Sequence, residues 1–148
     1  MRASTLTVKR LFSKRMEGKT VTKNKPSILI VDDDENIRKT LSAILRGKGY
    51  ITDTAKDGRE AIGKSKAKFF NLALLNIKLP DMEGTKLLTK LPEMVKIIIT
   101  GYPTLENAIE ALNLGADAYV IKPVRPEKLL ALIKGKLKEQ SQAEKMTE

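Results

Sequence analysis

Four apolar stretches of the sequence each end in polar residues that can do chemistry. Asp32 and Asp33 follow the first stretch, Asn76 ends the second, Thr100 the third and Lys122 the fourth. Carboxylates bind hard cations such as Mg²⁺, whereas a hydroxyl and an ammonium group bind phosphate oxygens. If these side chains meet in the folded chain, they are suited to a metal ion and a phosphoryl group.

Each of these residues also has an ordinary structural interpretation. Asp34 is suited to cap a following helix, Thr100 alone can be a loop hydroxyl, and Lys122 alone can be a solvated charge. The joint occurrence favours a shared site, because four of five predicted strands end in the polar type that one phosphoryl site requires. The chain has no cysteine and no histidine, which excludes disulfides, thiolate nucleophiles, histidine triads and a phosphohistidine.

Five strands alternating with five helices are predicted to hold these residues. The expected strands cover 27–31, 50–55, 70–76, 95–100 and 118–122, and the expected helices cover 35–48, 58–69, 84–91, 104–116 and 126–140. Alternating strands and helices with right-handed crossovers predict an α/β fold with a doubly wound, five-stranded parallel sheet of the flavodoxin-like type. In such sheets ligands bind at the carboxyl ends of the strands, where all the polar residues named above stand.

Two of the predicted helices carry apolar residues at helical spacing. Leu105, Ala108, Ile109 and Leu112 form one stripe, and a second stripe includes Leu129, Leu130, Ile133 and Leu137. These residues could form a contact surface or pack in the core, and we interpret Leu105, Ile109, Leu129 and Ile133 as core residues.

The charge is concentrated at the N-terminus. Residues 1–25 hold eight Lys or Arg and one acid, a net charge of +7, so the other 123 residues carry only +3 of the total of +10. We expect a basic, disordered extension at 1–25, one domain at 26–140 and a C-terminal tail at 141–148. The extension could hold nucleic acid by releasing counterions, or could simply be an upstream start. No apolar run is long enough to span a bilayer, so the sequence predicts a cytoplasmic protein with no membrane partner.

The motifs "ILIVDDDENIR", "LALLNIKLPDMEG", "KIIITGY" and "GADAYVIKP" resemble the receiver domain of two-component response regulators, over Ser27 to about Gln140. The resemblance implies that Asp33 is the direct Mg²⁺ ligand, that Asp32 acts mostly through water and that the Lys78 carbonyl completes the metal site. It further implies that Thr100 and Lys122 contact phosphoryl oxygens, that Thr100 and Tyr119 form the switch, and that Lys122–Pro123 is a cis peptide.

In the resemblance Asn76 stands at the position of the phosphoacceptor aspartate. An amide is not a nucleophile at neutral pH, so phosphotransfer to this position is closed. The amide oxygen can still ligate Mg²⁺, but one negative charge is missing, so we expect weak binding. An engineered substitution, a natural pseudo-receiver and a sequencing error would each explain the asparagine.

The sequence therefore predicts a stand-alone receiver that is not an enzyme and signals by protein–protein contact, as a monomer or weak dimer. Its expected partners are a histidine kinase or phosphorelay protein and a downstream protein target. The alternative is a regulator that binds nucleic acid through residues 1–25. A Mg²⁺-dependent phosphatase is disfavoured, because it too would need a nucleophilic carboxylate at residue 76.

Overall fold

The computed structural model describes residues 25–146, in which strands and helices alternate. The strands are β1 Ser27–Val31, β2 Ile51–Ala55, β3 Leu72–Asn76, β4 Val95–Thr100 and β5 Ala118–Ile121. The helices are α2 Glu35–Gly47, α3 Gly58–Ala67, α4 Gly84–Lys90, α5 Leu105–Asn113 and α6 Pro126–Lys145. The predicted basic extension and its nucleic-acid role lie outside the described residues, apart from Lys25.

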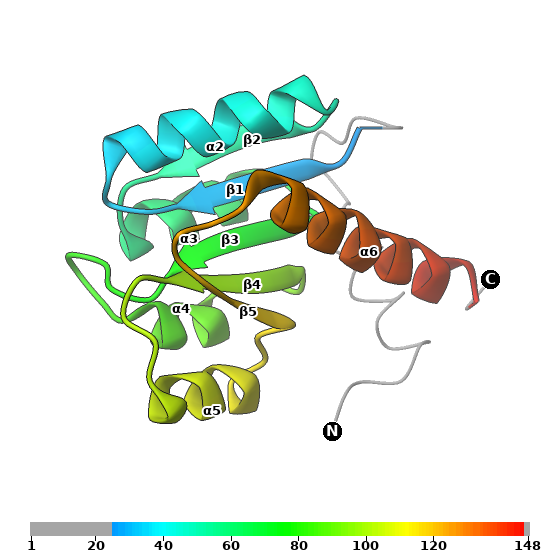
Figure 1. Ribbon diagram of the computed structural model, residues 1–148. Helices are drawn as coiled ribbons and strands as arrows, with labels where there is room; N and C mark the ends of the chain where they lie inside the picture. The colour runs from blue at the N-terminus through cyan, green and yellow to red at the C-terminus, as the bar shows by residue number, and fades with distance from the viewer. Residues whose placement is uncertain (1–24, 147–148) are drawn as a thin grey trace.

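All five strands form one parallel sheet in the order β2-β1-β3-β4-β5 (Figure 1). The predicted fold class is therefore confirmed. In this strand order β1 lies between β2 and β3, and their carboxyl ends lie at the same edge of the sheet. The expected site residues are thus brought to one end of the molecule.

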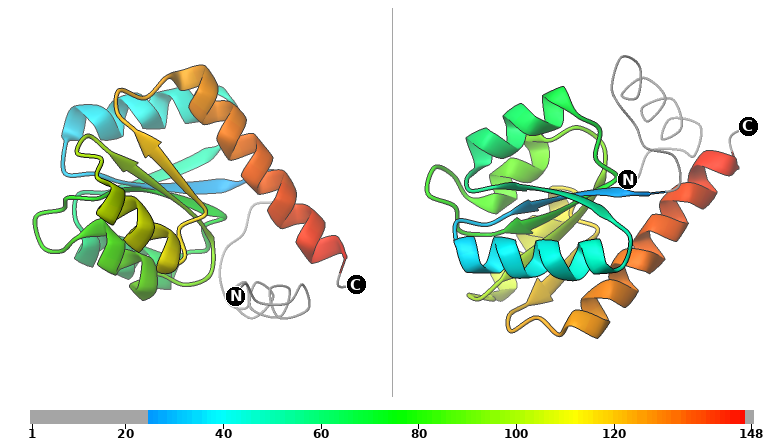
Figure 2. Two further views of the ribbon diagram at one scale, coloured as in Figure 1. Left: turned by 60° about the horizontal axis from the view of Figure 1, so that its bottom comes forward. Right: turned by 90° about the horizontal axis from the view of Figure 1, so that it is seen from above.

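Helices cover both faces of the sheet (Figure 2). Helices α2 and α6 pack on one face over a core that includes Ile28, Ile30 and Ile97, and α3, α4 and α5 pack on the other over Leu29, Leu75 and Ile98. Central strands are apolar on both faces because both faces are covered. In residues 25–146 no helix combines the length and the apolar character needed to cross a membrane.

Helix α2 begins and ends at the residues that local chemistry favours. The Asp34 side chain accepts hydrogen bonds from the backbone N–H groups of Asn36 and Ile37 at the first turn. Gly49, just past the C-terminal end, has a φ of 92°, a conformation that glycine adopts without strain. The Asp34 cap was predicted from the sequence.

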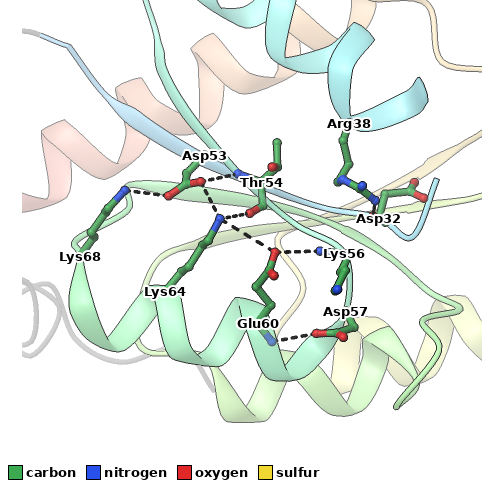
Figure 3. A network of polar contacts seen from close by, with 9 residues as sticks. All are labelled: Asp32, Arg38, Asp53, Thr54, Lys56, Asp57, Glu60, Lys64 and Lys68. Carbon is green, nitrogen blue, oxygen red and sulfur yellow. Dashed lines mark hydrogen bonds and ion pairs between the residues drawn. The ribbon is translucent and has the colours of Figure 1, made fainter. Parts of the chain in front are cut away.

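Helix α3 is held to the neighbouring strand β2 by charge (Figure 3). Asp53 of β2 lies 2.8 Å from Lys64 Nζ and 2.7 Å from Lys68 Nζ, and Lys64 also donates to the Thr54 carbonyl. Burial raises the pKa of the Asp53 carboxyl, but the hydrogen bonds from Lys64, Lys68 and the Thr54 N–H, together with the charge of Lys64, lower it overall. The carboxylate is thus stabilised in its charged form.

Helix α5 overturns part of the predicted core. Leu129 and Ile133 of α6 are buried as expected, with 2% and 0% of their surface exposed, but Leu105 and Ile109 are 77% and 51% exposed. The reason is that α5 turns its opposite side inward, where the small Ala111 is fully buried and Leu114 packs against the core. The apolar stripe of α5, Leu105, Ile109 and Leu112, faces solvent.

Helix α6 continues to Lys145, five residues beyond its predicted end, and its C-terminal part projects past the sheet (Figure 2). Gln140 ties this part to the amino end of β3, because its Nε2 donates to the Asn71 carbonyl at 2.9 Å and its Oε1 accepts from Asn71 Nδ2 at 3.3 Å. Asn71 Oδ1 in turn accepts from the Ser27 N–H.

Candidate functional site

Side chains at the ends of β1, β3 and β5, or directly after them, meet at the carboxyl edge of the sheet. Lys122 Nζ lies 3.1 Å from Asp32 Oδ2 and 3.3 Å from Asn76 Oδ1. These three residues come from positions up to 90 apart in the sequence, and only the shared sheet edge unites them. The structure thus brings together the acid, amide and ammonium groups that the sequence placed at one site.

The Asn76 amide makes polar contacts on both of its sides. Its nitrogen Nδ2 donates to the Lys78 carbonyl at 2.8 Å and, in a longer contact of 3.4 Å, to Asp33 Oδ1. Its oxygen Oδ1 accepts from Lys122. The opposite orientation would set the amide oxygen against two oxygens and the amide N–H against an ammonium group, so these neighbours fix the orientation.

The three aspartates after β1 have different surroundings. Asp32 is 4% exposed, and its Oδ1 accepts from the Asp34 N–H at 2.9 Å while its Oδ2 pairs with Lys122. Arg38 donates to the Asp32 backbone carbonyl at 2.7 Å, a contact that the sequence did not predict. Asp33 is exposed, and Asp34 caps α2. Asp32 is thus fixed in place, whereas Asp33 faces solvent.

The loop after β3 is held closely beside the site. The Gly84 N–H donates to the Ile77 carbonyl, and a Cβ at Gly84 would collide with the Asn76 carbonyl oxygen, so only glycine fits. The Lys78 ammonium lies 4.7 Å from the centre of the Tyr102 ring, a cation–π contact between the loop after β3 and the loop after β4. Neither role was predicted; the glycine in "PDMEGT" was the one available signal.

The same loop is fastened to α3. Asp81 accepts hydrogen bonds at 2.9 Å from the N–H groups of Gly58 and Arg59, which begin that helix. The hydrogen bond from Gly58 is the main cause that lowers the pKa of Asp81. A residue 23 positions away in the sequence therefore caps α3 together with its own N-cap, Asp57.

The two predicted switch residues are Thr100 at the end of β4 and Tyr119 in β5. Thr100 is 1% exposed, and its Oγ1 accepts from the Tyr102 N–H at 3.0 Å, so the hydroxyl bonds to its own loop. Tyr119 packs against the core beneath α5, and among the described residues its buried hydroxyl has no hydrogen-bond partner. The Lys122–Pro123 peptide is cis, as the resemblance implied. The phosphoryl-contact and switch roles remain predictions.

A cavity of about 350 Å³ lies between α2 and the start of α6, next to the site formed by Asp32, Asn76 and Lys122. Its lining is mostly aliphatic, and Asp32, Asn76 and Lys122 form part of its wall. An apolar surrounding strengthens the electrostatic contacts of the charged groups that border it.

Comparison with known proteins gives a consistent result. A family model described as response regulator receiver domain matches residues 28–134. The chain is 39% identical over 106 residues to the transcriptional regulatory protein ZraR of Klebsiella oxytoca, which is 69% of this chain and 24% of ZraR. It is 33% identical over 118 residues to the response regulator ArlR of Staphylococcus aureus (strain Mu50), which is 78% of this chain and 54% of ArlR. The chain thus spans between a quarter and about half of these relatives.

Solved structures show the same fold. The crystal structure of a CheY-like response regulator receiver domain protein from Methanospirillum hungatei JF-1 matches with a TM-score of 0.78 and 50% identity, over 80% of this chain and 98% of that one. A two-component response regulator from Clostridium difficile matches with a TM-score of 0.75 and 33% identity, over 77% of this chain and 97% of that one.

Proposed function

We propose that this chain, which belongs to the response regulator receiver domain family, is a signalling module whose phosphoacceptor position holds Asn76 in place of an aspartate. The supporting observation is the place of Asn76 at the carboxyl end of β3, bonded to Lys122 and next to Asp33 and the Lys78 carbonyl. A carboxylate there could attack a phosphorus atom and form an acyl phosphate. An amide cannot, so the module acts without phosphorylation at this residue and without catalysis of its own.

Receiver domains generally bind Mg²⁺ at their acidic phosphorylation site. The groups that would hold the ion in this chain are Asp32, Asp33 and the Lys78 carbonyl. As the side chains stand, they do not suit a cation, because the Asn76 N–H points at two of the oxygens that would bind it. We therefore expect Mg²⁺ to bind weakly.

Response regulators act with histidine kinases and phosphodonors. For this chain we assign the output to a downstream protein that contacts the solvent-facing side of α5 and β5. Exposed large apolar residues concentrate there: Tyr102, Leu105, Ile109, Leu112 and Ile121. A cluster of this kind is typical of a protein-binding surface, because the removal of exposed apolar side chains from water by a partner is energetically favourable.

Intact mass after treatment with acetyl phosphate and Mg²⁺ tests the acceptor position. We expect the unmodified protein to gain no phosphoryl group and Asn76→Asp to gain one. Asn113→Asp is the matched control, because it makes the same chemical change at an exposed position on α5 and should gain none. Equal labelling of the unmodified and Asn76→Asp proteins would place the acceptor elsewhere, with Asp32 or Asp33 the first residues to examine.

A further inference from the structure

We propose that the Asn76 amide nitrogen occupies the place of a metal ion, so that the chain closes its own cation site. This inference deepens the proposed function and rests on it. Two oxygens that would bind the cation, Asp33 Oδ1 and the Lys78 carbonyl, both accept hydrogen bonds from Asn76 Nδ2. The N–H groups carry partial positive charge toward those oxygens, as a cation would.

The number of acceptor oxygens explains why an amide has this effect. A carboxylate at residue 76 would offer two oxygens, one to a cation and one to Lys122. The amide offers a single oxygen, which already accepts from Lys122 at 3.3 Å. With that oxygen turned toward Lys122, Asn76 presents N–H groups, and no oxygen, to Asp33 and the Lys78 carbonyl.

Turning the amide over to serve a metal has a cost at each end. The amide N–H groups would then face the Lys122 ammonium, where donor meets donor, and the hydrogen bonds to Lys78 and Asp33 would be lost. Lys122 cannot easily move away, because Asp32 holds it at 3.1 Å and Asp32 is itself buried and bonded to the Asp34 N–H. The present orientation is therefore the one in which the three partners of the amide are all satisfied.

A blocking role and a ligand role for Asn76 predict opposite changes in Mg²⁺ affinity when the side chain is removed. If Asn76 were a weak metal ligand through its oxygen, its removal would weaken Mg²⁺ binding. If its N–H groups fill the site, its removal opens the two oxygens and strengthens binding. The substitution Asn76→Ala separates the two cases without a change in net charge.

The experiment is calorimetric titration of Mg²⁺ into the unmodified, Asn76→Ala and Asn36→Ala proteins, with thermal melts to show that each is folded. We expect Asn76→Ala to bind Mg²⁺ about threefold to tenfold more tightly than the unmodified protein, as loss of about one competing hydrogen bond implies. Asn36→Ala is the control, because Asn36 borders the same cavity and the structure shows no contact of its side chain with Asp33 or Lys78; its affinity should not change. Equal or weaker binding by Asn76→Ala would overturn the inference.

A second measurement uses the unmodified protein and does not depend on how the variant folds. The side-chain NH₂ resonances of Asn76 in a ¹⁵N correlation spectrum should shift when Mg²⁺ saturates the site, because the amide must leave its two acceptors. No shift at saturation would also overturn the inference. Labelling of Asn76→Asp by acetyl phosphate tests the acceptor position independently, so failure of one proposal can be told from failure of the other.

Discussion

Helices α5 and α6 carry similar apolar patterns but use them in opposite ways. In α6 the large residues Leu129 and Ile133 are buried against the sheet, whereas in α5 Leu105 and Ile109 face solvent and the small Ala111 faces inward. An apolar stripe at helical spacing therefore has two possible uses, as core or as binding surface. Which use applies depends on what the opposite side of the helix offers to the sheet.

The strongest test of this contrast compares two isoleucine truncations. Ile133→Ala should lower the free energy of unfolding by about 2–5 kcal/mol, because it leaves a cavity in a closed core. Ile109→Ala should lower it by less than about 1 kcal/mol, because half of its surface is already in water. Urea unfolding measures both. Similar losses at the two sites would mean that α5 is covered in solution.

A second test concerns the hydrogen bonds between Gln140 of α6 and Asn71 at the amino end of β3. Gln140→Ala should lower the free energy of unfolding by about 1–3 kcal/mol, because it removes two hydrogen bonds to Asn71 and leaves Asn71 Nδ2 without its Gln140 acceptor, while the Asn71 carbonyl keeps its bond from the Val95 N–H. Gln142→Ala on the exposed side of the same helix is the control and should change stability by less than about 0.5 kcal/mol. If the two glutamine variants unfold at the same urea concentration, the tie contributes nothing to stability.

A third test addresses the packing beneath α5. Tyr119→Phe removes a buried hydroxyl that has no partner among the described residues, so stability should stay the same or rise by up to about 1 kcal/mol. The melting temperature of the variant measures the effect. A clear decrease would show that the hydroxyl makes a hydrogen bond in solution.

The smallest change in stability is expected at α3, which is held to the sheet by ion pairs in addition to apolar packing. Asp53→Asn should cost less than about 1 kcal/mol at pH 7, since the Asp53 ion pairs are partly exposed. The folded-state pKa of Asp53 lies below its ordinary value of 3.8, so its contribution is fully present above that value and is lost as the pH falls through the lowered pKa. The difference in unfolding free energy between the two proteins should therefore shrink at pH 3. A difference that is constant with pH would rule out this charge effect.

Features that depend on neighbouring residues could be predicted from the sequence. The ends of the strands, the Asp34 cap and the turn at Gly49 follow from local chemistry, and the parallel fold then placed Asp32, Asn76 and Lys122 together. Contacts between distant residues could not be predicted. Asn71 and Gln140 are 69 positions apart, and Asp81 caps a helix that starts 23 positions earlier.

The exposed stripe of α5 was predicted wrongly for a physical reason. Hydrophobic periodicity shows that a helix has an apolar side and a polar side. A prediction from it assumes that the apolar side, with the larger side chains, packs in the core. Ala111 is small enough to let α5 approach the neighbouring elements closely, so the helix can pack through its less apolar side.

The contact between Lys78 and Tyr102 allows the site to be followed by intrinsic tyrosine fluorescence. The chain has no tryptophan and three tyrosines, so in a protein with Tyr50→Phe and Tyr119→Phe the tyrosine fluorescence comes from Tyr102 alone. That ring touches the residue whose carbonyl accepts from Asn76, so its emission can report movement of both loops without any attached dye.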